Sequence, residues 1–144
     1  MENQLKNYNP REILNSWEAQ ALATLTSKNY PTSFKAISEL MNDDNADIEI
    51  KRASKILFWG KVWRQAKTKE EVTTAWINLL DLIKNSNYQN MASYQDGIDA
   101  SKNLKERVDF PIKERILELN NEGLSDQQIV ERGFNKEQVL EILR

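Results

Sequence analysis

The chain contains neither cysteine nor histidine among its 144 residues. Without cysteine it has no disulfide framework, no thiol nucleophile and no cysteine ligand for zinc. Without histidine it has no Ser–His or Cys–His catalytic pair and no imidazole ligand for iron or copper. No nucleotide-binding loop or nucleophile elbow stands out either. We therefore expect a protein that is not an enzyme and that holds no cofactor and no metal.

Long hydrophobic runs are also missing. No apolar stretch approaches the roughly 18 residues that a membrane span needs. The N-terminal sequence MENQLKNYNPRE is polar and does not look like a signal peptide. The absence of cysteine suits a reducing compartment. Together these features predict a cytoplasmic protein with no membrane partner.

Glycine and proline are scarce, with 4 and 3 residues. No run of alternating β-branched residues is present, so the pattern predicts an all-α fold. Residues 1–85 should form a four-helix body. Its helices are expected to begin at the capping residue Asn9, to span Ser33–Met41, to span Asp47–Lys67 and to begin after the capping residue Thr68.

The periodic pattern dissolves after residue 85 and returns near the C-terminus. We interpret residues 86–110 as a connector and residues 111–144 as a small three-helix module. Its first helix is predicted over Pro111–Gly123, with proline near its start and glycine at its end. Ser125 and Asn135 are expected to cap the two short helices that follow.

The segment KRASKILFWGKVWRQAKTK, residues 51–69, has seven basic residues and no acidic one. Phe58, Trp59 and Trp63 are interleaved with the basic residues. One interpretation is an anion-facing helix for an acidic protein or for nucleic acid. The other is that the tryptophans are core and the bases form a solvated rim. The first interpretation makes these the candidate partner-binding residues: Lys51, Arg52, Lys55, Lys61, Arg64 and Lys67.

The C-terminal module has the layout of a helix-turn-helix, in which two glycines mark the turns. Its last helix offers Lys136, Gln138 and Glu141 as candidate partner-binding residues. Residues 109–144 carry five basic and eight acidic residues, a net charge of −3. Because phosphate contacts dominate affinity for DNA, this charge favours a protein contact over DNA.

The segment RILELNNEGLSDQQIVERGFNKEQVLEIL, Arg115–Leu143, resembles the helical C-terminal segment of glutamine-dependent NAD synthetases. The likeness lies in the pattern EGLS, IV, RGF and V, and it covers about a fifth of the chain. The family's Ser-Gly-Gly pyrophosphate-binding motif and its nitrilase-type cysteine are absent. The resemblance therefore implies a helical shape and no activity.

These observations predict a non-enzymatic regulator or adaptor that acts through protein–protein contacts, such as an inhibitor or accessory factor of phage or plasmid origin. The alternative is a DNA-binding accessory protein that uses the basic helix for phosphates and the C-terminal module for the grooves. The two differ in a simple measurement, because only DNA binding should weaken steeply with salt.

Overall fold

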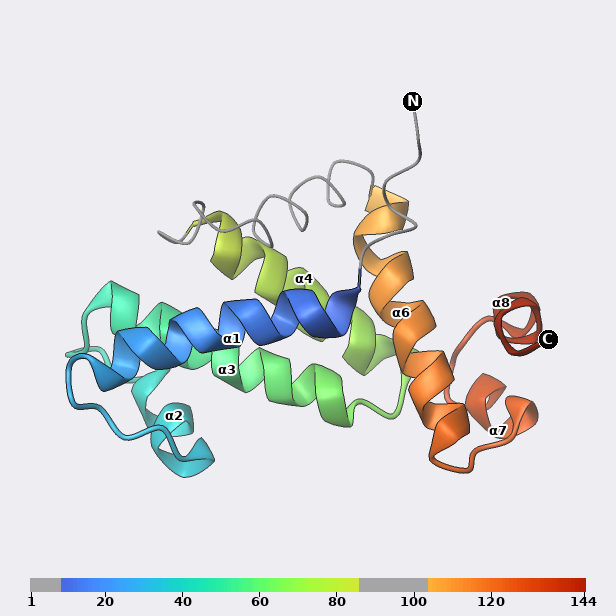
Figure 1. Ribbon diagram of the computed structural model, residues 1–144, viewed down its shortest axis with the longest axis horizontal. Coiled ribbons are helices and arrows are strands. Elements are labelled where there is room, and N and C mark those ends of the chain that lie inside the picture. The colour runs from blue at the N-terminus through green and yellow to red at the C-terminus, as the bar shows by residue number, and fades with distance from the viewer. Residues whose placement is uncertain (1–8, 86–103) are drawn as a thin grey trace.

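The computed structural model describes residues 9–85 and 104–144 (Figure 1). Within this part of the chain every regular element is an α-helix, so the predicted all-α fold is confirmed. The helices are α1 (Pro10–Thr26), α2 (Phe34–Leu40), α3 (Ile48–Gln65), α4 (Lys69–Lys84), α6 (Leu104–Asn121), α7 (Asp126–Val130) and α8 (Lys136–Leu143).

Most predicted helix starts are confirmed by their caps. The Asn9 side chain accepts hydrogen bonds from the Arg11 and Glu12 amides, and Pro10 occupies the first position of α1. Thr68 forms a reciprocal capping box with Glu71 at the start of α4. Such caps satisfy amides that have no partner inside the helix, which is why the sequence alone locates these starts.

The core is built where α1 crosses α3 and α3 packs on α4. Trp17, Trp63 and Trp76, from these three helices, are completely buried. The centroid of the Trp76 ring lies 5.5 Å from that of Trp17 and 5.7 Å from that of Trp63. Gly60 lies at the α1–α3 contact, where an added Cβ would come within 3.2 Å of Leu14 Cδ1 and closer still to the Glu18 carboxylate. The absence of a side chain at this position lets the two helices approach closely.

The short helix α2 covers one side of α3. The Phe34 side chain is 40% exposed, and Ile37 is the buried residue of α2. The Phe34 ring instead stacks on the Phe58 ring of α3, with the centroids 5.7 Å apart. A helix of two turns can bury only a narrow stripe, and Ile37 occupies that stripe.

The predicted start of the first C-terminal helix is wrong. We expected it at Pro111, whereas α6 begins at Leu104 and Pro111 lies inside it. Because proline has no backbone N–H, α6 lacks one hydrogen bond at Pro111, but the helix continues through this position. Residues 104–110, which we had given to the connector, therefore belong to α6. The rest of the expected connector, residues 86–103, lies outside the described residues.

Helices α7 and α8 pack against the end of α6. Ser125 forms a capping box with Gln128, and the Asn135 side chain accepts a hydrogen bond from the Gln138 amide, as predicted. Gly133 has a φ of +98°, a conformation that is rare for other residues. Buried residues of α7 and α8 belong to the same hydrophobic cluster as the tryptophans.

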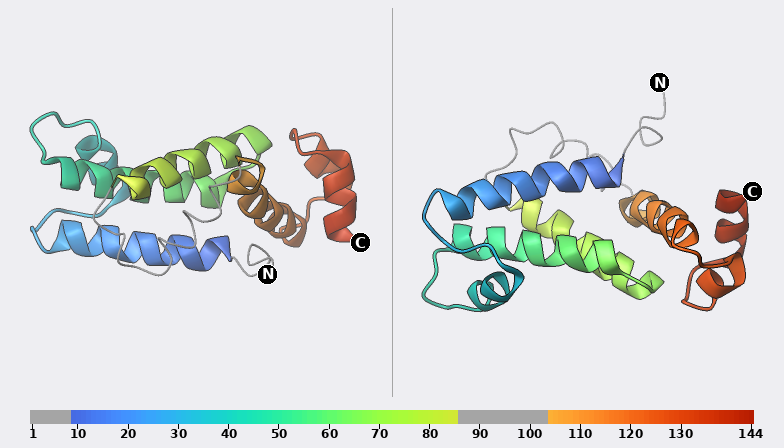
Figure 2. Two further views of the ribbon diagram at one scale, coloured as in Figure 1. Left: turned by 90° about the horizontal axis from the view of Figure 1, so that it is seen from above. Right: turned by 60° about the horizontal axis from the view of Figure 1, so that its bottom comes forward.

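Figure 2 shows α1 on one side of α3 and α4, with α6 crossing the end of these helices and α7 and α8 beyond it. None of the helices in residues 9–85 and 104–144 combines the length and hydrophobicity that a membrane span requires.

Candidate functional site

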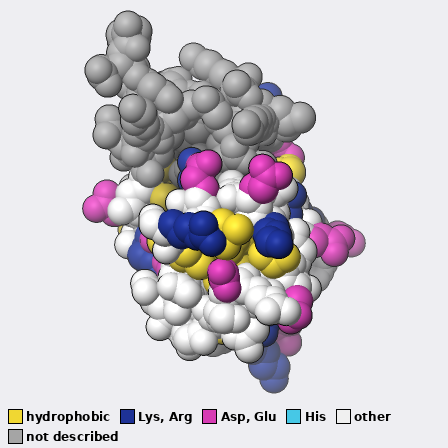
Figure 3. Space-filling view, turned by 90° about the vertical axis from the view of Figure 1, so that its right-hand side faces the viewer, with side chains coloured by type: hydrophobic (Ala, Val, Ile, Leu, Met, Phe, Trp, Pro, Cys, Tyr) yellow, Lys and Arg dark blue, Asp and Glu magenta, His cyan; other side chains and the backbone are white. Residues whose placement is uncertain are grey.

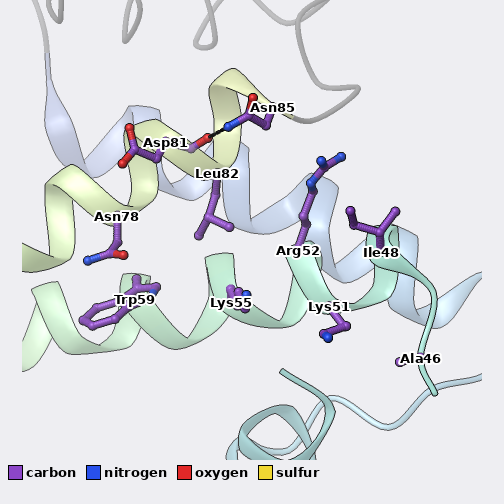
Figure 4. Close-up of a pocket in the computed structure, with 10 residues that line it drawn as sticks. All are labelled: Ala46, Ile48, Lys51, Arg52, Lys55, Trp59, Asn78, Asp81, Leu82 and Asn85. Carbon is purple, nitrogen blue, oxygen red and sulfur yellow. Dashed lines mark hydrogen bonds between the residues drawn. The ribbon is translucent and has the colours of Figure 1, made fainter. Parts of the chain in front are cut away.

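A groove lies between the N-terminal half of α3 and the C-terminal half of α4 (Figure 4). Its volume is about 460 Å³. Its lining consists of Ala46, Ile48, Lys51, Arg52, Lys55 and Trp59 from α3 and the loop before it, and of Asn78, Asp81, Leu82 and Asn85 from α4 and its C-terminal cap.

Three of the predicted partner-binding residues meet in this groove. Lys51, Arg52 and Lys55 lie on consecutive turns of α3, so the helical repeat places them on one face. All three are partly exposed, whereas Ile50, Ala53 and other residues of the opposite face are buried. The position of α3 in the core therefore fixes which of its basic residues face solvent.

The charges of the groove are only partly neutralised within the described residues. Lys51 Nζ lies 3.8 Å from Asp44, whose side chain is fully exposed. Arg52 and Lys55 form no ion pair in the part of the chain that the structure describes. Asp81 is the single carboxylate among the lining residues. The groove therefore has an excess of positive charge.

Trp59 gives the groove an aromatic surface. It is the partly exposed member of the four tryptophans, since Trp17, Trp63 and Trp76 are buried. Its ring meets the Phe58 ring edge to face, with the centroids 5.1 Å apart. Figure 4 shows Trp59 and Asn78 toward one end of the groove and Lys51 and Arg52 toward the other.

The remaining basic candidates of residues 51–69 point elsewhere. Arg64 Nη2 donates to Glu18 Oε1 at 2.7 Å and to Asn15 Oδ1 at 2.6 Å, both on α1. Lys67 Nζ donates to Glu122 Oε1 at 3.1 Å. Lys61 Nζ lies 4.4 Å from the centroid of the Phe34 ring, on the α2 side of α3. The structure thus divides the basic segment into a groove-facing set and a set engaged within the fold.

The most deeply buried charge of the described residues is not recognisable in the sequence. Arg115 is 1% exposed; it donates to the Ala66 carbonyl at 2.8 Å and forms an ion pair with Glu118. Glu118 also accepts from Arg11 Nε at 2.8 Å, which joins α1 to α6. We call Arg11, Lys67, Arg115, Glu118 and Glu122 the charge network. Glu118 is therefore an internal partner rather than a solvent-facing charge of α6.

The charge network and its surroundings shift two carboxyl pKa values in opposite directions. The hydrogen bond from Lys67 is the main cause of the lowered pKa of Glu122. Burial, followed by the negative charge of Glu118, raises the pKa of Glu114. The ordinary value for both residues is 4.5. The folded protein therefore disfavours the charged form of the Glu114 carboxyl group.

The C-terminal candidates do not form one surface. Lys136 is exposed and lines a separate groove between α7 and α8. Gln138 is half-buried, and its backbone N–H donates to Oδ1 of the cap residue Asn135 at 2.9 Å. Glu141 is exposed. Since 100° separates successive residues of a helix, Gln138 projects about 160° away from Lys136 and Leu140 along α8.

The α3–α4 groove can therefore bind an anionic group at one end and a flat or apolar group at the other. The three basic residues of this groove are recognisable in the sequence, but its second wall, on α4, is not. The α4 residues Asn78, Asp81 and Asn85 recur at spacings of three and four, which is the signal of a shared helix face. That spacing shows that they lie together, but it does not show which helix they face.

Comparison with protein-family models, with curated proteins and with solved structures finds no match to this chain. The resemblance of Arg115–Leu143 to NAD synthetases therefore stays a prediction.

Proposed function

We propose that this protein is a non-enzymatic adaptor or regulator that binds an acidic segment of a partner protein in the groove between α3 and α4. In this proposal α1–α4 form a four-helix body that carries the groove, and residues 111–144, from within α6 to the end of α8, form a smaller helix-turn-helix-like module. The absence of cysteine and histidine from the whole chain supports a role without catalysis.

The observation that carries the proposal is the convergence of Lys51, Arg52 and Lys55 beside the partly exposed Trp59. Lysine and arginine side chains can pair with any anion. The partly exposed indole of Trp59 and the side chain of Leu82 add an apolar surface to the same groove. Aromatic residues and arginine are enriched among the residues that dominate protein–protein binding energy. We therefore expect the bound segment to combine carboxylates with an aromatic or aliphatic anchor.

The distribution of charge supports a protein partner over DNA. The whole chain has a net charge of −2. Asp44 and Asp81 border the groove, and Arg64 and Lys67 are engaged in contacts within the fold. A duplex offers a long row of phosphates, and affinity for it grows with the number of bases that reach them. Three groove bases with carboxylates beside them match a short acidic segment better.

A capture experiment tests the proposal. The bait proteins are the wild type, a groove variant (Lys51→Glu with Lys55→Glu) and a matched control (Lys35→Glu with Lys113→Glu). The control makes the same charge change at exposed lysines that line neither groove described here. Each bait is incubated with extract of the native cell, and captured proteins are identified by mass spectrometry.

We expect at least one protein to be captured by the wild type and the control and to be lost from the groove variant. Its capture should weaken as salt is raised, because exposed charges are screened. Circular dichroism should show that all three baits are equally helical. Identical capture by all three folded baits would contradict the proposal.

DNA binding is the second candidate function. It is favoured by the three groove bases and by the α7–turn–α8 arrangement, and it is disfavoured by the exposed Glu137 and Glu141 of α8. Duplex binding across a salt series separates the two functions. Sub-micromolar, sequence-dependent affinity that falls steeply with salt and is lost in the groove variant would favour DNA over an acidic protein.

A further inference from the structure

A second groove lies between α7 and α8, at the opposite end of the molecule from the α3–α4 groove (Figure 1). Its volume is about 610 Å³. It is lined by Asp126, Gln127, Val130, Lys136, Leu140 and Arg144.

The floor of this groove is apolar and firmly held. Val130 and Leu140 are partly buried, and Val130 packs against the hydrophobic cluster that contains the buried trio Ile129, Phe134 and Val139. The capping box of α7 and the Asn135 cap of α8 fix both walls. A groove whose walls are fixed before binding loses little conformational entropy when a ligand enters.

Two cations border the apolar floor. Lys136 lies one turn before Leu140 on the same face of α8, and Arg144, directly after the end of the helix, lines the same groove. Both cations are exposed, and neither forms an ion pair within the part of the chain that the structure describes. Asp126, on the α7 wall, uses Oδ1 to accept from the Gln127 amide at 2.8 Å. Figure 3 views this end of the molecule and shows hydrophobic side chains exposed between two basic groups, with acidic groups above and below them.

We propose that the α7–α8 groove binds a short acidic amphipathic helix of a partner protein. The apolar stripe of that helix would pack on Val130 and Leu140, and its flanking carboxylates would pair with Lys136 and Arg144. The complementary charge is what selects this occupant over a purely apolar one. Docking of an amphipathic helix into an apolar groove is a common mode of recognition.

This surface is separate from the α3–α4 groove and does not rest on the function proposed for it. A chain that presents two binding surfaces at opposite ends can hold two protein segments at once. With the α7–α8 groove as a second binding surface, the protein would link two partner proteins rather than bind only one.

The test uses the full-length protein and three fluorescein-labelled synthetic peptides of about 15 residues, a length at which a designed helix begins to form in water. The first peptide has leucines at helical spacing flanked by glutamates. The second has glutamine in place of every glutamate, and the third has the composition of the first in scrambled order. Binding is measured by fluorescence anisotropy at low salt.

We expect the acidic amphipathic peptide to bind the wild type and the other two to bind roughly tenfold more weakly or not at all. Lys136→Glu combined with Arg144→Glu should weaken binding roughly tenfold or more, and it leaves the buried trio untouched. Leu140→Ser tests the floor. The control Lys35→Glu with Lys113→Glu and the groove variant of α3 should both bind like the wild type.

Each contrary result overturns the inference in its own way. Unchanged binding in the Lys136 and Arg144 double variant, or equal binding of the glutamine peptide, would remove the charge complementarity. Loss of binding in the α3 groove variant alone would place the peptide in the other groove, which supports the proposed function and rejects this surface. A dimer in sedimentation that Leu140→Ser abolishes would assign the surface to a second copy of the chain.

Discussion

Lys55 and Arg64 are basic residues of the same helix, α3, and they have opposite roles in this structure. Lys55 faces the α3–α4 groove and forms no ion pair within the described residues. Arg64 is tied to Glu18 and Asn15 of α1 at 2.7 and 2.6 Å. Both residues are positively charged at neutral pH, so the difference comes from the helices that pack beside each half of α3.

The C-terminal end of α3 lies where α1 and α6 bring carboxylates to it. Glu18 of α1 pairs with Arg64, and Glu122 of α6 pairs with Lys67, two residues beyond the end of α3. The N-terminal half faces α4, which offers the amides of Asn78 and Asn85 and a single carboxylate. Positive charge is therefore used for assembly at one end of α3 and remains available for binding at the other. The following predictions test this division.

The largest expected effect is at the centre of the charge network. Arg115→Ala removes the donor to the Ala66 carbonyl and one of the partners of Glu118. The mostly buried Glu118 then keeps only its pair with the half-exposed Arg11, and the Ala66 carbonyl loses its donor, so unfolding should become easier by about 3–5 kcal/mol. Urea denaturation followed by circular dichroism measures the loss.

Arg11→Ala is the matched control for Arg115→Ala, because Arg11 pairs with the same Glu118 but its side chain is 45% exposed. Solvent screens an exposed pair, so this change should cost no more than about 1 kcal/mol. Equal losses for the two variants would show that burial does not distinguish them.

The comparison within α3 gives the second prediction. Arg64→Ala should destabilise the fold by about 1–3 kcal/mol, because it breaks charged hydrogen bonds between partly buried groups of α1 and α3. Lys55→Ala should change stability by no more than about 0.5 kcal/mol. Thermal and urea unfolding of both variants provides the measurement. A loss for Lys55→Ala as large as that for Arg64→Ala would abolish the division of α3 that we describe.

Much of this fold could be predicted from local sequence because its signals are local. Asn9, Thr68, Ser125 and Asn135 cap their own helices, and a cap depends only on residues within one turn. The start of α6 could not be predicted in this way. Proline at position 111 looks like a first-turn residue, and only packing against α4 and the core shows that it is an interior one.

The candidate site was half predictable for the same physical reason. Lys51, Arg52 and Lys55 lie within two turns of each other, so their shared face follows from the helical repeat. The partners that bind Arg64 and Lys67 come from distant parts of the chain, Glu18 and Glu122, and no local pattern indicates those contacts. Arg115 gave no signal, because a buried arginine in an amphipathic helix looks like an exposed one in sequence.

A smaller effect is expected in the pH dependence of stability. Burial and the charge of Glu118 raise the pKa of Glu114 in the folded state above its ordinary value of 4.5. The folded state therefore binds the carboxyl proton of Glu114 more tightly than the unfolded state does. The contribution of Glu114 to stability falls as pH rises from the ordinary pKa to the raised pKa of the folded state. Glu114→Gln should remove this decline and raise the melting temperature at neutral pH.

Melting curves of the wild type and of Glu114→Gln, recorded from mildly acidic to neutral pH, measure the effect. The two melting temperatures should be closest at the acidic end and should separate as pH rises. Curves that separate in the opposite direction would mean that the folded state favours the charged form of Glu114.

The smallest expected change in stability is in the α3–α4 groove, and its sign is what matters. Lys51 and Lys55 are like charges four residues apart on one helix face, a spacing that destabilises a helix by about 0.2–0.5 kcal/mol. Lys55→Glu replaces this repulsion by an attraction, so stability should rise by about 0.5 kcal/mol at low salt and the gain should shrink as salt screens it. The same variant should capture less of the acidic partner, because one of the three groove bases has changed sign. Stability gained together with binding lost would show that the bases are retained for binding at a cost to the fold. Reduced stability in Lys55→Glu would instead show that Lys55, like Arg64, supports the structure.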